Sequence, residues 1–224
     1  MFFPEKILSI KKTDRVLEIG PGSMPFPRAD FFLEKKFDSN EERLQQSGNA
    51  IPATLKKPVY FYDGGSFPFD DDEFDYVICS HVIEHVEDIE HFGSELFRIA
   101  DKGYLEYPTI YYEYLYNFNV HLNFLKKNNN NLFYIRKENL DFDKYYPVQK
   151  FFYESLTKGY TDIVDDLKIY MFEGFEWVEP FQIIEAKNVD QLIFENYCIN
   201  KKKIGMKSIP RKFFNYFNKL TSDL

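Results

Sequence analysis

The stretch RVLEIGPG at residues 15–22 decides the fold. Its Val, Leu and Ile side chains form a short apolar run, and Gly20-Pro21-Gly22 ends that run abruptly. An apolar run closed by glycines is typical of a strand buried inside a parallel sheet. Glycines at the end of such a strand let a ligand approach the backbone closely. We therefore expect a buried strand here, with a ligand site at its carboxyl end.

Further short apolar runs follow at fairly regular intervals, and most are separated by polar or helical segments. We expect them to be strands at residues 29–33, 59–62, 74–79, 103–107, 172–178 and 181–185. Apolar residues at helical spacing predict a helix over 89–100. Alternation of strands with crossovers predicts an α/β fold, a Rossmann-like seven-stranded, mostly parallel sheet. Only residues 21–28 join the first two strands, so we expect a loop or a single turn there instead of a helix.

The sequence changes character after Pro108. An aromatic-rich segment follows at about 109–150, and its four asparagines at 128–131 separate two apolar runs, which predicts a hairpin. Residues 149–156 and 162–169 have the pattern of helices. We expect one domain over 1–200, with 109–150 inserted on its substrate side, and a separate basic amphipathic tail at 201–224.

Composition restricts the class of protein. The chain has 224 residues, 44% of them hydrophobic, which is enough for a real core. A net charge of −8 argues against a nucleic-acid partner. The start of the chain does not resemble a leader peptide, and no apolar run approaches the roughly 20 residues that span a bilayer. We therefore expect a cytoplasmic protein.

Polar residues stand where successive strands are expected to end. Glu34 follows the second strand, where a carboxylate can accept both hydroxyls of a ribose. Asp63-Gly64 follows the third strand, where a carboxylate can accept an adenine amino group. Ser80-His81 follows the fourth strand directly. A third glycine of the dinucleotide fingerprint is missing, which counts against a nicotinamide cofactor.

In this order the motifs resemble class I S-adenosylmethionine-dependent methyltransferases of the type 11 subgroup. The shared pattern is a glycine loop, an acid after the second strand, an Asp-Gly before a Phe-Pro-Phe acidic turn, and then His-Val-x-Glu-His, over about residues 14–108. The resemblance implies S-adenosylmethionine as cofactor and S-adenosylhomocysteine as product. It assigns the methionine end to Glu18, Gly20 and Gly22, the ribose to Glu34, the adenine to Asp63 and Gly64, and the neighbourhood of the sulfur to Ser80 and His81.

Two histidines are candidates for catalysis, because each lies just beyond the fourth strand. We expect His81 to be the first choice for a general base and His85 the second. Residues 81–85 also spell H-x-x-E-H, the inverted zinc-protease motif. That motif needs both histidines on an established helix and a third ligand downstream. We therefore expect no metal.

The resemblance implies an acceptor that is a small molecule or a glycan, and aromatic faces favour a sugar or surface-polysaccharide precursor. One alternative is a non-catalytic module that keeps the fold and binds the cofactor or a partner. The tail at 201–224 is open to two interpretations: a terminal helix docked on its own domain, or a segment that makes weak contact with an anionic membrane surface.

Overall fold

The computed structural model describes residues 1–46 and 55–194 of the chain, and Met1–Ile193 form a compact unit. The expected basic tail at 201–224 lies outside the described residues. Among the described residues, no helix combines the length and the apolar character that crossing a membrane requires.

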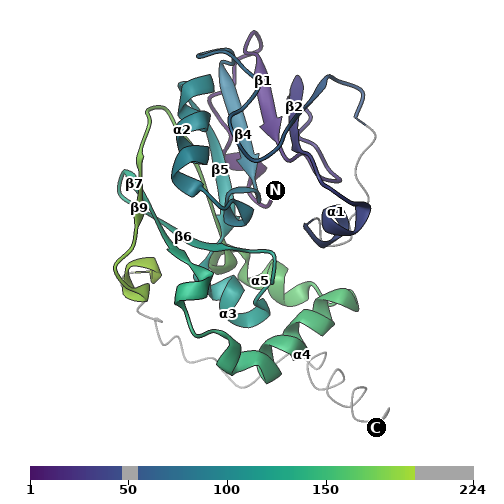
Figure 1. Ribbon diagram of the computed structural model, residues 1–224, viewed down its shortest axis with the longest axis vertical. Coiled ribbons are helices and arrows are strands. Elements are labelled where there is room, and N and C mark those ends of the chain that lie inside the picture. Colours follow the sequence, from purple (N-terminus) through teal and green to yellow (C-terminus); the bar gives the residue numbers. More distant parts are fainter. Residues whose placement is uncertain (47–54, 195–224) are drawn as a thin grey trace. The chain divides into compact units, whose positions relative to one another are not determined.

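The main sheet has six strands in the order β3-β2-β1-β4-β5-β8 (Figure 1). The first five are mutually parallel and the last runs antiparallel to β5. Their bounds are β1 Val16–Ile19, β2 Phe31–Lys35, β3 Val59–Tyr62, β4 Tyr76–Ser80, β5 Gly103–Pro108 and β8 Phe172–Trp177. The expected α/β fold with a mostly parallel sheet is therefore confirmed.

The strand order reverses between β1 and β4, because β2 and β3 lie on one side of β1 while β4 and β5 lie on the other. Open α/β sheets bind ligands at such a reversal, beyond the carboxyl ends of the strands. All four residues of β1 are buried, because side chains cover both faces of the sheet. Leu17 and Ile19 pack with Val77 on one face, and Val16 packs with Ile78 on the other. Burial on both faces explains why β1 is a continuous apolar run interrupted only by Glu18.

A second, three-stranded sheet overturns the expectation of seven strands in one sheet. It has the order β6-β7-β9, with bounds Asn123–Asn128, Asn131–Arg136 and Gln182–Glu185. The predicted hairpin is confirmed as β6 and β7. The run at 181–185, expected in the main sheet, pairs instead in parallel with β7. Two conditions favour that site: β7 offers a free edge, and Gly93 leaves room for Ile183, whose Cδ1 would lie 2.1 Å from a Cβ at that position.

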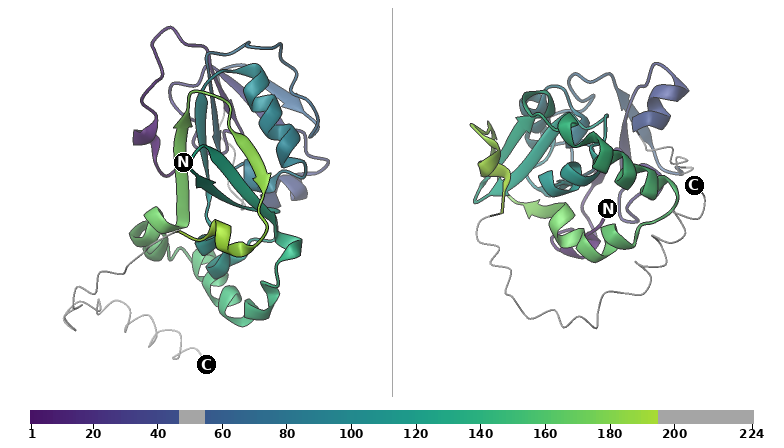
Figure 2. Two further views of the ribbon diagram at one scale, coloured as in Figure 1. Left: turned by 90° about the vertical axis from the view of Figure 1, so that its left-hand side faces the viewer. Right: turned by 90° about the horizontal axis from the view of Figure 1, so that it is seen from below.

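The helices are short (Figures 1 and 2). Their bounds are α1 Asn40–Gln46, α2 Ile89–Ile99, α3 Ile110–Tyr116, α4 Tyr146–Thr157 and α5 Asp162–Met171. The 3-10 turns are Pro4–Lys6, Ile83–His85, Lys137–Asn139, Asp143–Tyr145 and Val189–Leu192. The predicted helices at 89–100, 149–156 and 162–169 are confirmed as α2, α4 and α5. No helix joins β1 and β2, as expected from the short connection.

The start of α2 has a local cause. Asp88 begins the helix, because its side chain accepts a hydrogen bond from the His91 N–H at 2.9 Å. The predicted apolar stripe of Ile89, Phe92 and Leu96 is buried against the main sheet.

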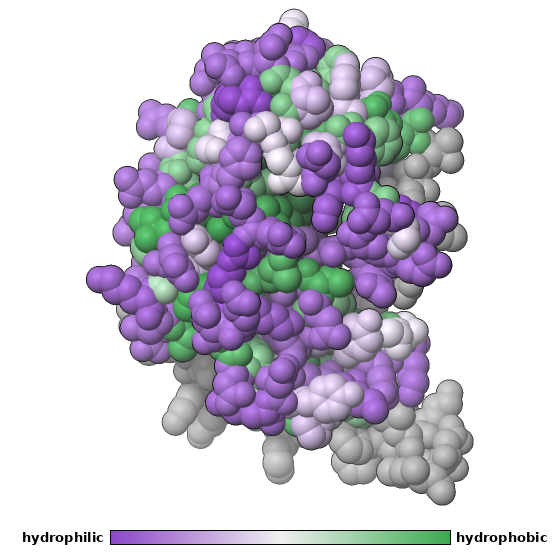
Figure 3. Space-filling view, viewed as in Figure 1, coloured by the Kyte–Doolittle hydropathy of each residue, from purple (hydrophilic) through white to green (hydrophobic). Residues whose placement is uncertain are grey.

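Outward-facing side chains are polar over most of the face seen in Figure 3, with apolar side chains exposed around its middle.

Candidate active site

A cavity of about 1240 Å³ lies at the carboxyl ends of β1 and β4. Helices α3 and α4 contribute to its opposite side, and Figure 1 shows them gathered beyond the strand ends. The cavity brings together most of the residues that the sequence singled out. It is lined by Glu18, Gly20, Gly22, Ser80, His81 and His85.

The glycine bend owes its shape to two left-handed backbone conformations. Gly20 has φ +62° and Gly22 has φ +57°, a region that residues with a Cβ rarely adopt. A Cβ on Gly20 would also lie 2.5 Å from Cγ2 of Val82. The Gly20 N–H donates to the carbonyl of Leu33 at 2.9 Å, which ties the bend to β2. Gly22 has open space beside it and faces the cavity.

Glu18 is the charged residue of the buried β1 strand. It is 4% exposed, and its Oε2 accepts a hydrogen bond from the Phe26 N–H at 2.7 Å. Burial raises the pKa of this carboxyl to about 7, although the Phe26 N–H opposes the shift. A buried carboxyl with a pKa of about 7 can ionise when a cation enters the cavity, and the carboxylate then pairs with that cation.

The remaining predicted cofactor residues do not line this cavity. Glu34 lines a separate hollow of about 580 Å³ beside Phe61 and the start of α1. Burial raises the pKa of Glu34, and its Oε1 accepts from the Lys35 N–H at 3.1 Å. Asp63 is exposed, with its Oδ1 accepting from the Gly65 N–H at 3.3 Å, and Gly64 has φ +100°. Neither hollow is lined by Asp63 or Gly64.

His81 is held between two buried carboxylates. Its Nε2 lies 3.0 Å from Glu106 Oε1, and its Nδ1 lies 3.4 Å from Glu84 Oε1. Burial alone would lower the pKa of His81, but the two glutamates overcome it and raise the pKa to about 9. With both ring nitrogens facing carboxylates, the ring is a double donor and has no lone pair to take a proton. The geometry therefore disfavours the expected role of His81 as a general base.

Glu106 is a site residue that sequence reasoning missed. It is fully buried on β5, and burial alone would raise its pKa, but hydrogen bonds, with His81 the largest, lower the pKa to about 2. Besides the His81 ring, its carboxylate accepts from the N–H groups of Phe2 and Phe3 and the hydroxyls of Ser80 and Tyr104, at 2.7–3.0 Å. A glutamate inside the apolar strand at 103–107 was the available signal, because a buried charge requires partners.

Beyond the tip of β4, the turn Ile83–His85 presents a second histidine. His85 Nδ1 donates to the carbonyl of Val120 at 2.9 Å, so Nε2 carries the lone pair. Burial lowers the pKa of His85, which keeps the ring neutral. By geometry, His85 has the available lone pair, and it was only the second choice from the sequence.

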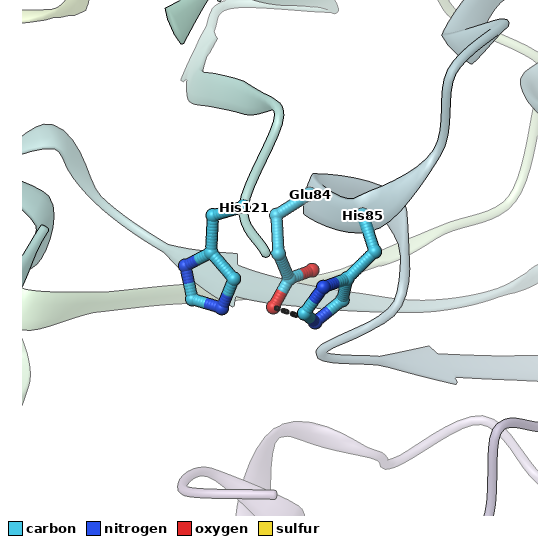
Figure 4. A group of neighbouring side chains, drawn as sticks. All are labelled: Glu84, His85 and His121. Atoms are coloured by element: carbon cyan, nitrogen blue, oxygen red, sulfur yellow. Dashed lines mark ion pairs between the residues drawn. The ribbon is translucent and has the colours of Figure 1, made fainter. Parts of the chain in front are cut away.

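Three more polar residues of this region were not predicted. Glu84 is fully buried, and among the described residues neither of its carboxylate oxygens accepts a hydrogen bond. His121 is also buried, and its Nδ1 lies 2.5 Å from Oε1 of Glu113. Figure 4 shows the Glu84 carboxylate between the imidazoles of His85 and His121. The ligand atoms of these three residues lie within 4.8 Å of one another.

Aromatic side chains complete the cavity. Tyr112 and Tyr116 of α3 line it, while Tyr114 is 47% exposed. Phe2 stacks on Phe172 with ring centroids 3.8 Å apart, and both rings line the same cavity.

Comparison with known proteins gives a family match over the central strands. Residues 36–105 match a family model described as a methyltransferase domain. No curated protein matches the chain significantly.

Among solved structures, similar ones include the YcgJ protein from Bacillus subtilis (21% identity, TM-score 0.33), which covers 46% of this chain and 50% of that one. An S-adenosylmethionine-dependent methyltransferase from Mesorhizobium loti has 19% identity and a TM-score of 0.32, covering 46% and 49% of the two chains. One from Aquifex aeolicus has 21% identity and a TM-score of 0.32, covering 48% and 63%. The likeness thus spans about half the length of these structures.

The matched segment begins just after β2 and includes the ends of β3 and β4, where Asp63 and His81 stand, together with the His-Val-x-Glu-His motif. The preceding glycine bend and the strand order agree with it. Over residues 36–105 the chain is thus similar to the methyltransferase domain, in agreement with the resemblance that its motifs show.

Proposed function

We propose that the protein transfers the methyl group of S-adenosylmethionine to a small-molecule or glycan acceptor. The observation that carries the proposal is one continuous cavity. It joins the glycine bend at Gly20 and Gly22 to the buried histidines and to the aromatic residues of α3. A cofactor bound at the bend would therefore share one enclosed space with an acceptor bound beside α3.

The residues at the bend fit the charged end of the cofactor. Glu18 lines the cavity with a partly satisfied carboxylate, suited to an ammonium group, and the bend at Gly22 leaves open space beside the backbone. We assign the ribose to Glu34 and the adenine to Asp63 and Gly64, which stand at the carboxyl ends of the neighbouring strands β2 and β3, so this half of the cofactor would extend out of the cavity along the sheet edge.

When bound, the cofactor supplies an activated methyl group on a sulfonium, so the protein chiefly aligns the reactants and excludes water. Ser80 and His81 stand at the tip of β4, and Glu106 fixes both side chains from β5. We assign them to positioning at the sulfonium end of the cavity. His85 is the histidine whose lone pair can accept a proton from an acceptor.

The size of the cavity supports a small acceptor. Typical ligand pockets of about 300–1,000 Å³ enclose a single drug-sized molecule, whereas this cavity measures about 1240 Å³. That volume has room for the cofactor and a modest second molecule. The faces of Tyr112 and Phe118 line the acceptor side, and aromatic faces of this kind suit the apolar face of a sugar ring. We favour a sugar or surface-polysaccharide precursor for that reason.

Calorimetric titration with S-adenosylhomocysteine tests the cofactor site. We expect binding by the wild-type protein, and about tenfold weaker binding after Glu18→Gln, the loss of about 1.4 kcal/mol. The matched control is Glu87→Gln, an exposed glutamate outside the cavity, which should bind as the wild type does. Absence of affinity for both the cofactor and its product would overturn the proposal.

The acceptor class needs a second experiment. Protein and labelled S-adenosylmethionine are incubated with separated small-molecule, glycan, protein and nucleic-acid fractions of a cell extract. We expect label in the small-molecule or glycan fraction only. Label confined to the protein or nucleic-acid fraction would refute the acceptor class while leaving methyl transfer intact.

A further inference from the structure

The acceptor side of the cavity holds three neighbouring side chains of the kind that bind metal ions, Glu84, His85 and His121. Glu84 is 0% exposed, and neither of its oxygens accepts a hydrogen bond from a described residue. A buried carboxylate is costly unless it has a partner of opposite charge and hydrogen bonds. His81 supplies charge from one side, with its Nδ1 3.4 Å from Glu84 Oε1. The hydrogen-bonding capacity of the Glu84 carboxylate is left for a ligand that approaches from the side of His85 and His121.

The two neighbouring imidazoles have the orientation of metal ligands. His85 Nδ1 donates to the Val120 carbonyl, and His121 Nδ1 contacts the Glu113 carboxylate. A histidine that binds a metal characteristically gives its other ring nitrogen to a backbone carbonyl or a carboxylate. Both Nε2 atoms are consequently left for an ion, and His85 Nε2 already lies 3.9 Å from Glu84 Oε1.

We propose that Glu84, His85 and His121 bind one divalent transition-metal ion, such as Zn²⁺, on the acceptor side of the cavity. Two imidazoles and a carboxylate are a ligand set that such ions prefer. The ligand atoms lie within 4.8 Å of one another. Around a tetrahedral ion at about 2.0–2.2 Å, ligand atoms lie roughly 3.3–3.6 Å apart, so the side chains close in by up to about 1.5 Å on binding.

The expectation of no metal rested on the H-x-x-E-H motif, which would use His81 and His85 on an established helix with a third ligand downstream. In the structure His81 is occupied by Glu106, while Glu84 of the same motif joins His85. The downstream ligand is His121, which the loop before β6 brings to the turn at Ile83–His85.

Three protein ligands leave at least one position of the ion open, and all three residues line the cavity. With the ion bound, the His85 lone pair is a metal ligand and no longer takes a proton, so the ion would activate an acceptor hydroxyl by lowering its pKa. In the transfer, the hydroxyl proton leaves to solvent and the oxygen electron pair bonds to the methyl carbon. The carbon–sulfur bond breaks with its pair on sulfur, leaving the neutral thioether. This role, unlike the site itself, rests on the proposed function, and it implies an oxygen acceptor.

Metal titration of the full-length protein tests the site directly. Calorimetry with Zn²⁺ should show one ion per chain, and Co²⁺ should give visible absorption bands of a nitrogen- and oxygen-ligated ion. We expect His121→Ala to weaken Zn²⁺ binding at least 100-fold. The matched control is His91→Ala, which removes a histidine of α2 that lies outside the cluster and should bind Zn²⁺ as the wild type does.

A second variant keeps both imidazoles and guards against misfolding. Glu113→Gln should weaken Zn²⁺ binding by about 10- to 100-fold, because it removes the carboxylate that orients His121. The site is refuted if the wild type binds no stoichiometric metal, or if His121→Ala and His91→Ala bind equally. S-adenosylhomocysteine titration of the same samples separates the two proposals. Metal binding without nucleoside binding would refute only the proposed function, and the reverse only the metal site.

Discussion

The two regions on either side of His81 contrast sharply. Toward β5, the Glu106 carboxylate accepts hydrogen bonds from several backbone and side-chain donors of the chain. Toward the turn at Ile83–His85, the equally buried Glu84 accepts none from the described residues. Glu106 has its hydrogen bonds supplied by the fold, whereas Glu84 has the charge of His81 beside it but no hydrogen bond. The difference separates a carboxylate that holds the site together from one that is free to bind the proposed ion.

We expect the greatest loss of stability when Glu106 loses its charge. Glu106→Gln should lower the free energy of unfolding by about 3–4 kcal/mol, because it leaves His81 facing a neutral amide and one donor without an acceptor. The measurement is urea denaturation. Glu176→Gln is the control, since that carboxylate accepts from Ser9 and Tyr76 at a partly exposed place and should cost about 1 kcal/mol. Equal losses for the two variants would remove the contrast between them.

Gly20→Ala tests whether the bend and the turn move together. The new Cβ meets Val82, which lies between His81 and the turn at Ile83–His85. We expect a loss of about 3 kcal/mol, from left-handed strain of about 1–2 kcal/mol and the collision. Gly159 is the control, because its φ is +83° and an added Cβ would have nothing within 4 Å. Gly159→Ala therefore introduces the left-handed strain without a collision and should cost about 1–2 kcal/mol. Equal costs would show that Val82 yields freely.

The dependence of stability on Zn²⁺ tests whether Glu84 is a metal ligand. Zn²⁺ at 100 times its dissociation constant should stabilise the wild-type protein by about 2.7 kcal/mol, measured as a denaturation shift. Glu84→Gln should show no such shift. Without metal, that variant should stay within about 1 kcal/mol of the wild type, because the lost oxygen accepts no hydrogen bond. A loss as large as that of Glu106→Gln would mean that Glu84 is structural.

The buried Glu18 carboxylate accepts a hydrogen bond from the Phe26 N–H, and the dependence of stability on pH tests its environment. Its pKa of about 7 lies above the ordinary value of 4.5, so the folded protein holds the proton more tightly than the unfolded chain. This contribution to stability is complete at low pH and disappears as pH rises from about 4.5 to 7.

A cationic cofactor prefers the ionised carboxylate, so affinity should change in the opposite sense. Between pH 8 and pH 6 the ionised fraction of a group with this pKa falls about tenfold, and we expect S-adenosylmethionine affinity to fall by up to that factor. Isothermal titration at several pH values measures it. Glu18→Gln should give a flat profile over this range, and a sloping profile in the variant would assign the effect to another group.

Much of the cofactor half follows from local signals. The apolar run at 15–19 predicts the buried strand β1, and the glycines that follow it predict the bend. Both features depend on only a few neighbouring residues. The hairpin and α2 are predictable for the same reason. Acids at the ends of β2 and β3 could be placed at one edge, since parallel strands end together.

The remaining features depend on contacts between segments that are distant in the sequence. Pairing of β9 with β7 depends on a free strand edge and on the space beside Gly93, both far away in sequence. The charge on His81 depends on Glu106, and the grouping of Glu84, His85 and His121 depends on the path of the loop before β6. Sequence patterns encode conformations of neighbouring residues, whereas the chemistry of a buried side chain is set by the distant groups that replace its water.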